Sequence, residues 1–294
     1  MLAWFFRSRP TQAPAQGDGS LSALPPAQKL ARLAIFAGLY ALIAGAAWQL
    51  SAAVFTVGFS VLVLLVLCEL YTLVALRSRM LRVVGMVASV LLLVRPVAWP
   101  ALPGTLILSL TWLGGFTLLS LSTARPHRRE LYDLLMMICG VFSVTLTLGQ
   151  LVAIRALAAG RPCVVLVVAT VAARESGAAL GGLVFPGAPT INLVVSPRKN
   201  YAGWLVGATA SLVTALVVRQ VLDLAMTIGQ AAVFGLCLGA ACQLGDLSES
   251  YLKRMVRRRH SSNALGPEGG LLDTTDALAF GAVVASGLLH LWGA

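Results

Sequence analysis

Ionisable side chains are concentrated in residues 245–276, near the end of a chain that is otherwise strongly apolar. On a helix beginning near the start of this segment, Asp246, Ser250, Lys253 and Arg257 lie along one face, because their spacing follows the helical repeat. The stripe presents an anion, a hydroxyl and then cations. Hard carboxylate oxygens bind Mg²⁺, and Lys and Arg neutralise phosphate oxygens. The spacing therefore predicts a site for a divalent metal ion and a polyphosphate.

A second carboxylate is expected to join this stripe from the next helix. Asp273 follows the Gly269-Gly270 turn and begins the last apolar stretch. Two carboxylates from separate helices can hold one metal ion, so Asp246 and Asp273 are the predicted Mg²⁺ ligands, with a second cation left open. The alternative is an ordinary charged cytoplasmic loop in which Asp273 caps a helix. For the three arginines at 257–259 alone, this alternative is preferred.

Three further charges interrupt apolar stretches. Glu69 lies deep in the second stretch, where an isolated carboxylate costs about 3 kcal/mol. It is expected either to meet a partner or water, or to be protonated and hydrogen-bonded between helices. Arg174 and Glu175 stand before glycines 177–182, whose spacing is typical of close helix packing. Packing explains the glycines but leaves the charged pair unexplained.

A cationic loop follows that pair and contains Ser196, Arg198 and Lys199. A basic loop at the membrane edge usually reflects topology alone. Beside an intramembrane carboxylate, it can instead hold a phosphate head group.

These residues must be positioned by membrane-spanning helices. The composition is 58% hydrophobic and 11% charged, which is more apolar surface than one soluble core can bury. We predict an all-α, polytopic integral membrane protein with about nine transmembrane helices. The stretch at 83–95 is short, so eight helices with this segment re-entrant stay possible. The predicted spans are 33–50, 52–76, 83–95, 104–121, 131–154, 163–185, 202–221, 226–244 and 273–292.

The distribution of charge orients these spans. With the N-terminus in the cytoplasm, most of the 22 Lys and Arg fall on the cytoplasmic side, as the positive-inside rule requires. The net charge of +11 is then mainly a topology signal, and a nucleic-acid partner is not expected. We divide the chain into a flexible cytoplasmic tail (1–30), an N-terminal transmembrane region (31–130) and a C-terminal transmembrane region that carries the chemistry (131–294).

Common catalytic motifs are missing from the sequence. The five cysteines all fall in predicted spans and have no spacing typical of disulfides or zinc, and the three histidines are scattered. The chain has no phosphate-binding P-loop and no nucleophile elbow.

Three motifs together resemble one known family. The segment 245–276 is similar, without a gap, to the C-terminal signature of the phosphatidate cytidylyltransferases, or CDP-diacylglycerol synthases. Ser196-Pro197-Arg198-Lys199 resembles that family's SPKKTWEG element, and Glu175-Ser176-Gly177-Ala178 its DTGAY element. The resemblance covers residues 130–292 with recognisable motifs. It implies a multi-pass enzyme of the cell inner membrane with its active site on the cytoplasmic side, and a homodimer is one expected assembly.

The resemblance also implies a reaction and a set of roles. The family transfers CMP from CTP to phosphatidate, which yields CDP-diacylglycerol and pyrophosphate. Asp246, Lys253 and Asp273 would then be catalytic, with Asp246 and Asp273 on the metal. Substrate phosphates would be bound by Ser196, Arg198, Lys199, Ser250 and Arg254, with Glu175 at the same site.

Several motif positions differ from the family pattern, notably Glu175, Ala202, Glu268 and Thr274. Glu268 and Thr274 each stand where the family has a residue that can carry positive charge. These differences motivate a second hypothesis, in which a catalytically impaired relative acts as a lipid-binding or assembly protein. A third hypothesis, a transporter, is disfavoured because the polar residues collect at the cytoplasmic edge rather than at the midplane.

Overall fold

The protein is a bundle of long helices in the computed structural model, which describes residues 26–122, 128–191, 199–256, 261 and 270–293. Apart from one isolated bridge between Thr190 and Asn200, the described residues contain no β-structure. The helices are α1 (Pro26–Gln49), α2 (Ala52–Leu73), α3 (Arg79–Ala98), α4 (Gly104–Ser122), α5 (Arg128–Gly140), α6 (Gln150–Arg155), α7 (Gly160–Val184), α8 (Tyr201–Val221), α9 (Ile228–Met255) and α10 (Leu271–Leu291). A π-helical segment, η2 (Val141–Leu146), joins α5 to the short α6.

Within the described residues, eight helices are long and apolar enough to cross a membrane. They include the continuous stretch Arg128–Arg155, and the shorter apolar helix Ala34–Gln49 comes in addition. The prediction of an all-α polytopic membrane protein is confirmed. The third predicted span is a 20-residue helix, α3, and it is one of the eight that are long and apolar enough to cross a membrane.

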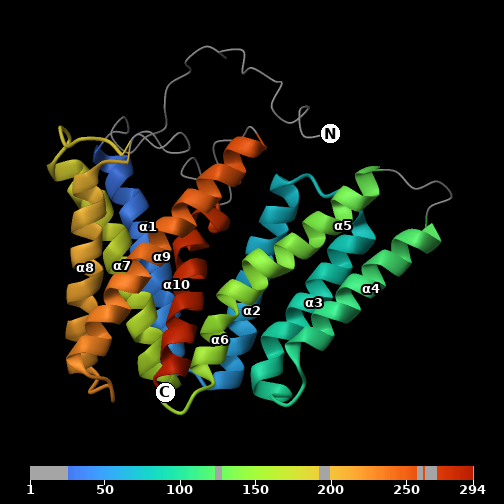
Figure 1. The fold of residues 1–294 in the computed structure, drawn as a ribbon, viewed down its shortest axis with the longest axis horizontal. Helices are drawn as coiled ribbons and strands as arrows, with labels where there is room; N and C mark the ends of the chain where they lie inside the picture. Colours follow the sequence, from blue (N-terminus) through green and yellow to red (C-terminus); the bar gives the residue numbers. More distant parts are fainter. Residues whose placement is uncertain (1–25, 123–127, 192–198, 257–260, 262–269, 294) are drawn as a thin grey trace.

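Two groups of helices stand side by side in Figure 1. One group contains α1 and α7 to α10, and the other contains α2 to α6. Helix α10 packs against α9 and α7 in its own group and against α2 and α6 in the other. The α10 helix is therefore in contact with both groups.

Glycines bring α7 and α8 into close contact. A Cβ added to Gly181 would lie 2.8 Å from the carbonyl oxygen of Ala202, and one added to Gly207 would lie 2.9 Å from that of Arg174. Small residues allow this approach in membranes, where packing rather than hydrophobicity drives association. The packing role expected for the glycines of α7 is confirmed for Gly177 and Gly181, whereas a Cβ on Gly182 would meet nothing within 4 Å. This packing fixes the start of α8 against the part of α7 that carries the charged pair.

Helix α1 packs mainly on α7 and to a lesser extent on its neighbour in sequence, α2. The hydroxyl of Tyr40 donates a hydrogen bond of 3.1 Å to the carbonyl oxygen of Thr274 in α10. At the other end of α1, Arg155 donates to the carbonyl oxygens of Ala47 and Leu50. These contacts make α1 part of the same packing unit as α7 and α10.

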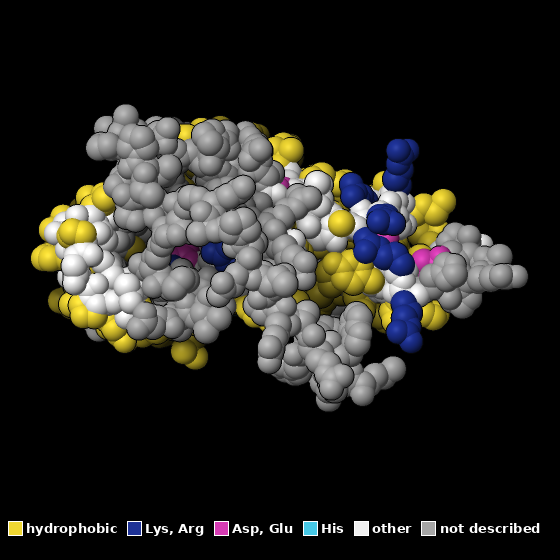
Figure 2. Space-filling view, turned by 90° about the horizontal axis from the view of Figure 1, so that it is seen from above, with side chains coloured by type: hydrophobic (Ala, Val, Ile, Leu, Met, Phe, Trp, Pro, Cys, Tyr) yellow, Lys and Arg dark blue, Asp and Glu magenta, His cyan; other side chains and the backbone are white. Residues whose placement is uncertain are grey.

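Charged residues gather at one end of the bundle. Figure 2 views this end and shows Lys and Arg side chains over the ends of α2, α3 and α5. Exposed arginines in that region are Arg77, Arg79, Arg128 and Arg129. The start of α10 and the end of α9 lie at the same end in Figure 1. The basic segments and the charged segment near the C-terminus therefore share one end of the bundle, as their charge pattern predicts.

Candidate functional site

The charged segment is the continuation of a membrane helix. We expected a separate helix beginning near Gly245, but α9 runs without a break from Ile228 to Met255. Gly245 lies where α9 touches α10, since a Cβ there would be 2.6 Å from the carbonyl oxygen of Asp276. A larger residue would push the two helices apart. The close approach places Asp246 beside the first turns of α10.

Asp246 is held by two cations from other elements. Its Oδ2 accepts from Nη1 of Arg174 in α7 at 2.8 Å and from Nζ of Lys199 at 2.9 Å. Arg174 also pairs with the adjacent Glu175 and with Gln243 of α9. Its side chain is only 3% exposed, and a buried guanidinium needs such partners. The contact of Arg174 with Asp246 and Gln243 of α9 therefore explains why α7 carries a charged pair.

The start of α8 positions Lys199 beside Asp246. Asn200 caps that helix, since its Oδ1 accepts from the backbone N–H of Gly203 at 2.8 Å. The cap fixes Lys199 immediately before the helix. Because Gly203 also packs against Ala178 of α7, the three elements that carry Glu175, Lys199 and Asp246 form one unit.

A second polar group surrounds the start of α10. Nζ of Lys253 lies 2.5 Å from Oε2 of Glu249 and 3.3 Å from Oδ1 of Asp273. Asp273 also accepts from the backbone N–H groups of Gly270 at 3.1 Å and of Ser261 at 3.3 Å. Asp273 therefore stabilises the first turn of α10, from the third position of the helix rather than as the N-cap residue, which is Gly270.

Glu69 reaches the same turn from α2. Its Oε2 accepts from the backbone N–H of Leu272 at 3.1 Å, and its Oε1 pairs with the hydroxyl of Ser261. Glu69 is 8% exposed. A Cβ on Gly270 would collide with the Glu69 carboxylate. Of the two environments expected for Glu69, the structure shows a carboxylate with hydrogen-bond partners, and these partners hold the start of α10.

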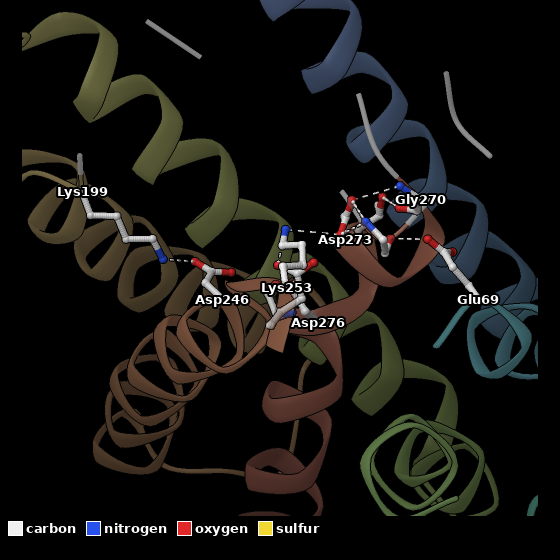
Figure 3. A network of polar contacts seen from close by, with 11 residues as sticks. Glu69, Lys199, Asp246, Lys253, Gly270, Asp273 and Asp276 are labelled. Atoms are coloured by element: carbon white, nitrogen blue, oxygen red, sulfur yellow. Dashed lines mark hydrogen bonds and ion pairs between the residues drawn. The ribbon is translucent and has the colours of Figure 1, made fainter. Parts of the chain in front are cut away.

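Asp276 is a site residue that the sequence analysis did not select. It lies close enough to Asp246, Glu175 and Lys253 for their charges to act on it, and Figure 3 shows it with Lys253 between Asp246 and Asp273. Its position about one turn after Asp273, within the same charged segment, was the available signal. Asp276 connects the two polar groups.

The remaining predicted site residues are placed as follows. Ser250 is half-buried and Arg254 is exposed, both near the end of α9. Ser196 and Arg198 lie outside the described residues, as do Arg257 and Glu268. Thr274 is buried, and its hydroxyl donates to the carbonyl oxygen of Gly270. The Thr274 side chain is therefore bonded to the backbone of its own helix.

Comparison with known protein families identifies the family of the chain. The model of the "Cytidylyltransferase family" matches residues 30–292. The chain belongs to this family. The match extends well beyond the motifs, from α1 to the end of α10, and confirms the resemblance seen in the sequence.

Curated relatives of this cytidylyltransferase family member are bacterial proteins named phosphatidate cytidylyltransferase. That of Brucella suis biovar 1 (strain 1330) is 36% identical over 124 residues, which is 42% of each chain. That of Helicobacter pylori (strain ATCC 700392 / 26695) is 32% identical over 137 residues, covering 45% of this chain and 48% of the relative. That of Staphylococcus epidermidis (strain ATCC 12228 / FDA PCI 1200) is 36% identical over 87 residues, covering 30% and 34%. Each alignment thus spans less than half of the relative.

The carboxylates can be tested against the metal that the family implies. Among the residues that the structure describes, no three or more His, Cys, Asp and Glu are arranged to hold a metal ion. Mg²⁺ usually takes one or two protein carboxylates and completes its shell with water and substrate phosphates. Asp246 and Asp276, from two touching helices, suit that donor set. All three carboxylates already accept hydrogen bonds: Asp246 from Arg174 and Lys199, Asp273 from Lys253 and two backbone N–H groups, and Asp276 from the N–H of Ala277. The roles predicted for Asp246 and Asp273 as ligands therefore stay predictions.

Proposed function

We propose that the protein is a CTP:phosphatidate cytidylyltransferase, which transfers CMP from CTP to phosphatidate and releases CDP-diacylglycerol and pyrophosphate. One observation carries the proposal. The three motifs bring Glu175, Lys199 and Asp246 into a single charged group at one end of a membrane bundle, next to Asp276. This arrangement supports a reaction between a water-soluble nucleotide and a membrane lipid.

The cations of the site differ in how freely they can reach a substrate. The side chain of Arg174 is 3% exposed, whereas that of Lys199 is 27% exposed, and both contact Asp246. We propose that Arg174 remains in place and holds the carboxylates, while Lys199 turns to the phosphates of CTP. Ser196 and Arg198 of the same loop, with Ser250 and Arg254 of α9, are proposed to bind phosphate oxygens as well.

The proposed reaction needs no protein nucleophile. An oxygen of the lipid phosphate attacks the α-phosphorus of CTP, and the bond from that phosphorus to the pyrophosphate oxygen breaks. Bound Mg²⁺ would neutralise charge on the transferring phosphoryl group. Lys199 would stabilise the negative charge that develops on the leaving pyrophosphate, and Lys253 would hold the attacking lipid phosphate. The carboxylates of Asp246 and either Asp276 or Asp273 are proposed to hold the ion.

The location of the site follows from the same proposal. CTP is soluble, so the charged end must face the compartment that contains it, and the basic segments at that end favour the cytoplasm. We propose the inner membrane of a bacterial cell as the setting, because the named relatives are bacterial. The assembly state, for which a homodimer is proposed, is open to direct mass measurement in detergent.

The deciding experiment is an assay of the purified protein in detergent with Mg²⁺, CTP and dioleoyl phosphatidate. We expect CDP-diacylglycerol to form, and Asp246→Asn to abolish its formation. Asp223→Asn is the matched control, because Asp223 lies in the α8–α9 turn with a left-handed backbone (φ 46°) that Asn also adopts. CTP binding without product would favour the lipid-binding or assembly protein. Absence of both would reject the proposal.

A further inference from the structure

A large apolar cavity lies beside the charged site. Its volume is about 620 Å³, and residues of α2, α5, η2, α9 and α10 line it. Most of the lining is aliphatic or aromatic. The polar exceptions include Ser248, Glu249, Thr275 and Asp276. Because Glu249 and Asp276 also interact with Lys253, the cavity is continuous with the charged site.

The cavity extends along the helices into the apolar part of the bundle. On the α5–η2 side its lining runs from Tyr132 to Leu148, which is about 24 Å of helix at 1.5 Å per residue. One leaflet of a bilayer contributes about half of the roughly 30 Å hydrocarbon core. The cavity is therefore long enough to take an acyl chain from one leaflet over its whole length.

The cavity is also reachable from the surface of the bundle. Several lining residues are exposed, with Tyr251 at 56%, Met255 at 62% and Phe280 at 36%. On the opposite wall, Cys139 and Ser143 are exposed as well. In a membrane, exposed side chains at this depth contact lipid. A lipid molecule can thus pass from the bilayer into the cavity without leaving the hydrocarbon.

The π-helical segment η2 forms part of this wall. It contributes Ser143 and Val144 to the lining, and π-helical turns inside α-helices occur frequently at functional sites. Just before it, Gly140 packs against Tyr71 and Leu67 of α2. The wall is therefore anchored to α2 at Gly140, and beyond that point Ser143, Val144 and Leu148 line the cavity.

We propose that this cavity holds an acyl chain of the lipid substrate, with the lipid phosphate at Lys253, and that Cys139 and Ser143 control which chains fit. The inference rests on the proposed function for the identity of the lipid. The apolar wall buries the chain, and the phosphate is expected at Lys253, which lies outside the lining and contacts the lining residue Glu249. The cavity would thus determine chain-length preference.

The test uses a tryptophan to fill the cavity, with a matched control one helical turn away. Cys139→Trp and Ser143→Trp insert a large side chain into the cavity. Leu135→Trp places the same side chain on the same helix at a position that is 43% exposed and outside the lining. Binding of dioleoyl and of dihexanoyl phosphatidate to the full-length protein is measured by native mass spectrometry, and folding is checked by thermal denaturation.

We expect Cys139→Trp and Ser143→Trp to weaken binding of the dioleoyl lipid at least about tenfold, because less of its chain can be buried. Binding of the short-chain lipid should change less than about threefold, and Leu135→Trp should leave both unchanged. Equal loss for both lipids, or the same loss in Leu135→Trp, would overturn the proposal. If Cys139→Trp does not fold, Ser143→Trp alone decides the result.

The binding measurement separates this inference from the proposed function. Chain-selective loss of binding in a protein that makes no CDP-diacylglycerol would support the cavity and reject the enzyme. Normal production of CDP-diacylglycerol by the wild type, with unchanged dioleoyl binding in both cavity variants, would reject the cavity and keep the enzyme.

Discussion

The carboxylate of Glu69 in α2 accepts a hydrogen bond from the backbone N–H of Leu272 at the start of α10, across a separation of 203 residues. The same carboxylate pairs with Ser261, which in turn donates to Asp273. A residue in the second span thereby positions the helix that carries Asp273 and Asp276. The charged site depends on a helix that contains none of the motifs.

Replacing Glu69 should affect turnover more than substrate binding. Glu69→Ala leaves the buried N–H of Leu272 without its acceptor, which costs about 1–3 kcal/mol of stability. Since Asp276 moves with α10, we expect kcat to fall by about a hundredfold while KM for CTP changes little. Glu69→Gln retains an acceptor and should recover part of kcat. Steady-state kinetics on both variants measure this. A change confined to thermal stability would show that Glu69 has a structural role only.

Gly270 should tolerate no side chain while Glu69 is present. Its Cβ would collide with the Glu69 carboxylate, so Gly270→Ala is expected to lower the free energy of unfolding by about 1–3 kcal/mol. In the Glu69→Ala background the clash with the carboxylate disappears and only the 2.6 Å approach to the Ser261 hydroxyl remains, so the two effects should not add. Gly182→Ala in α7 is the control, because nothing lies within 4 Å of its Cβ. Additive effects in the double variant would contradict the contact.

Asp273→Asn and Asp276→Asn should impair different properties, the first stability and the second the response to Mg²⁺. Asp273 accepts backbone hydrogen bonds at the start of α10, so Asp273→Asn should lower stability by about 1 kcal/mol. Asp276→Asn should leave the melting temperature nearly unchanged and raise the Mg²⁺ concentration needed for half-maximal activity. Activity titrated against Mg²⁺, with thermal denaturation of each variant, distinguishes the two. An unchanged Mg²⁺ dependence in Asp276→Asn would exclude it as a ligand.

Arg174 and Lys199 contact the same oxygen of Asp246, but replacing each should have a different effect on the protein. Arg174→Gln leaves Glu175 and Asp246 without their buried cation, and we expect a loss of about 3–5 kcal/mol in stability. Lys199 is more exposed, so Lys199→Gln should fold normally and raise KM for CTP by about tenfold. Thermal denaturation and CTP titration provide the two measurements. A strongly destabilised Lys199→Gln protein would contradict the proposed division of roles.

Much of this architecture can be predicted from local patterns. Apolar stretches predict the spans because a helix must cross a fixed thickness of hydrocarbon. The glycines of α7 predict close packing because only small residues permit it. The spacing of Asp246, Ser250 and Lys253 predicts a shared helix, and α9 contains all three.

The parts that the sequence did not predict depend on contacts between distant segments. The partner of Glu69 and the partner of Arg174 lie on other helices, and no local spacing identifies them. Asp276 was passed over in favour of Asp273 because both begin the same helix, and only the approach of α9 at Gly245 distinguishes them. The continuity of α9 was missed because its polarity changes abruptly at Gly245 although its backbone does not.

The packing of α1 has a consequence for how the chain is made. Helix α1 precedes the other described helices along the chain, yet it packs mainly on α7 and, through Tyr40, contacts the first turn of α10. Domains usually fold from the N-terminus as they are synthesised, but α1 must wait in the bilayer until both later helices have been inserted. The contact between Tyr40 and α10 can form only after α10 has been inserted, so α1 completes its packing later than its place in the chain suggests.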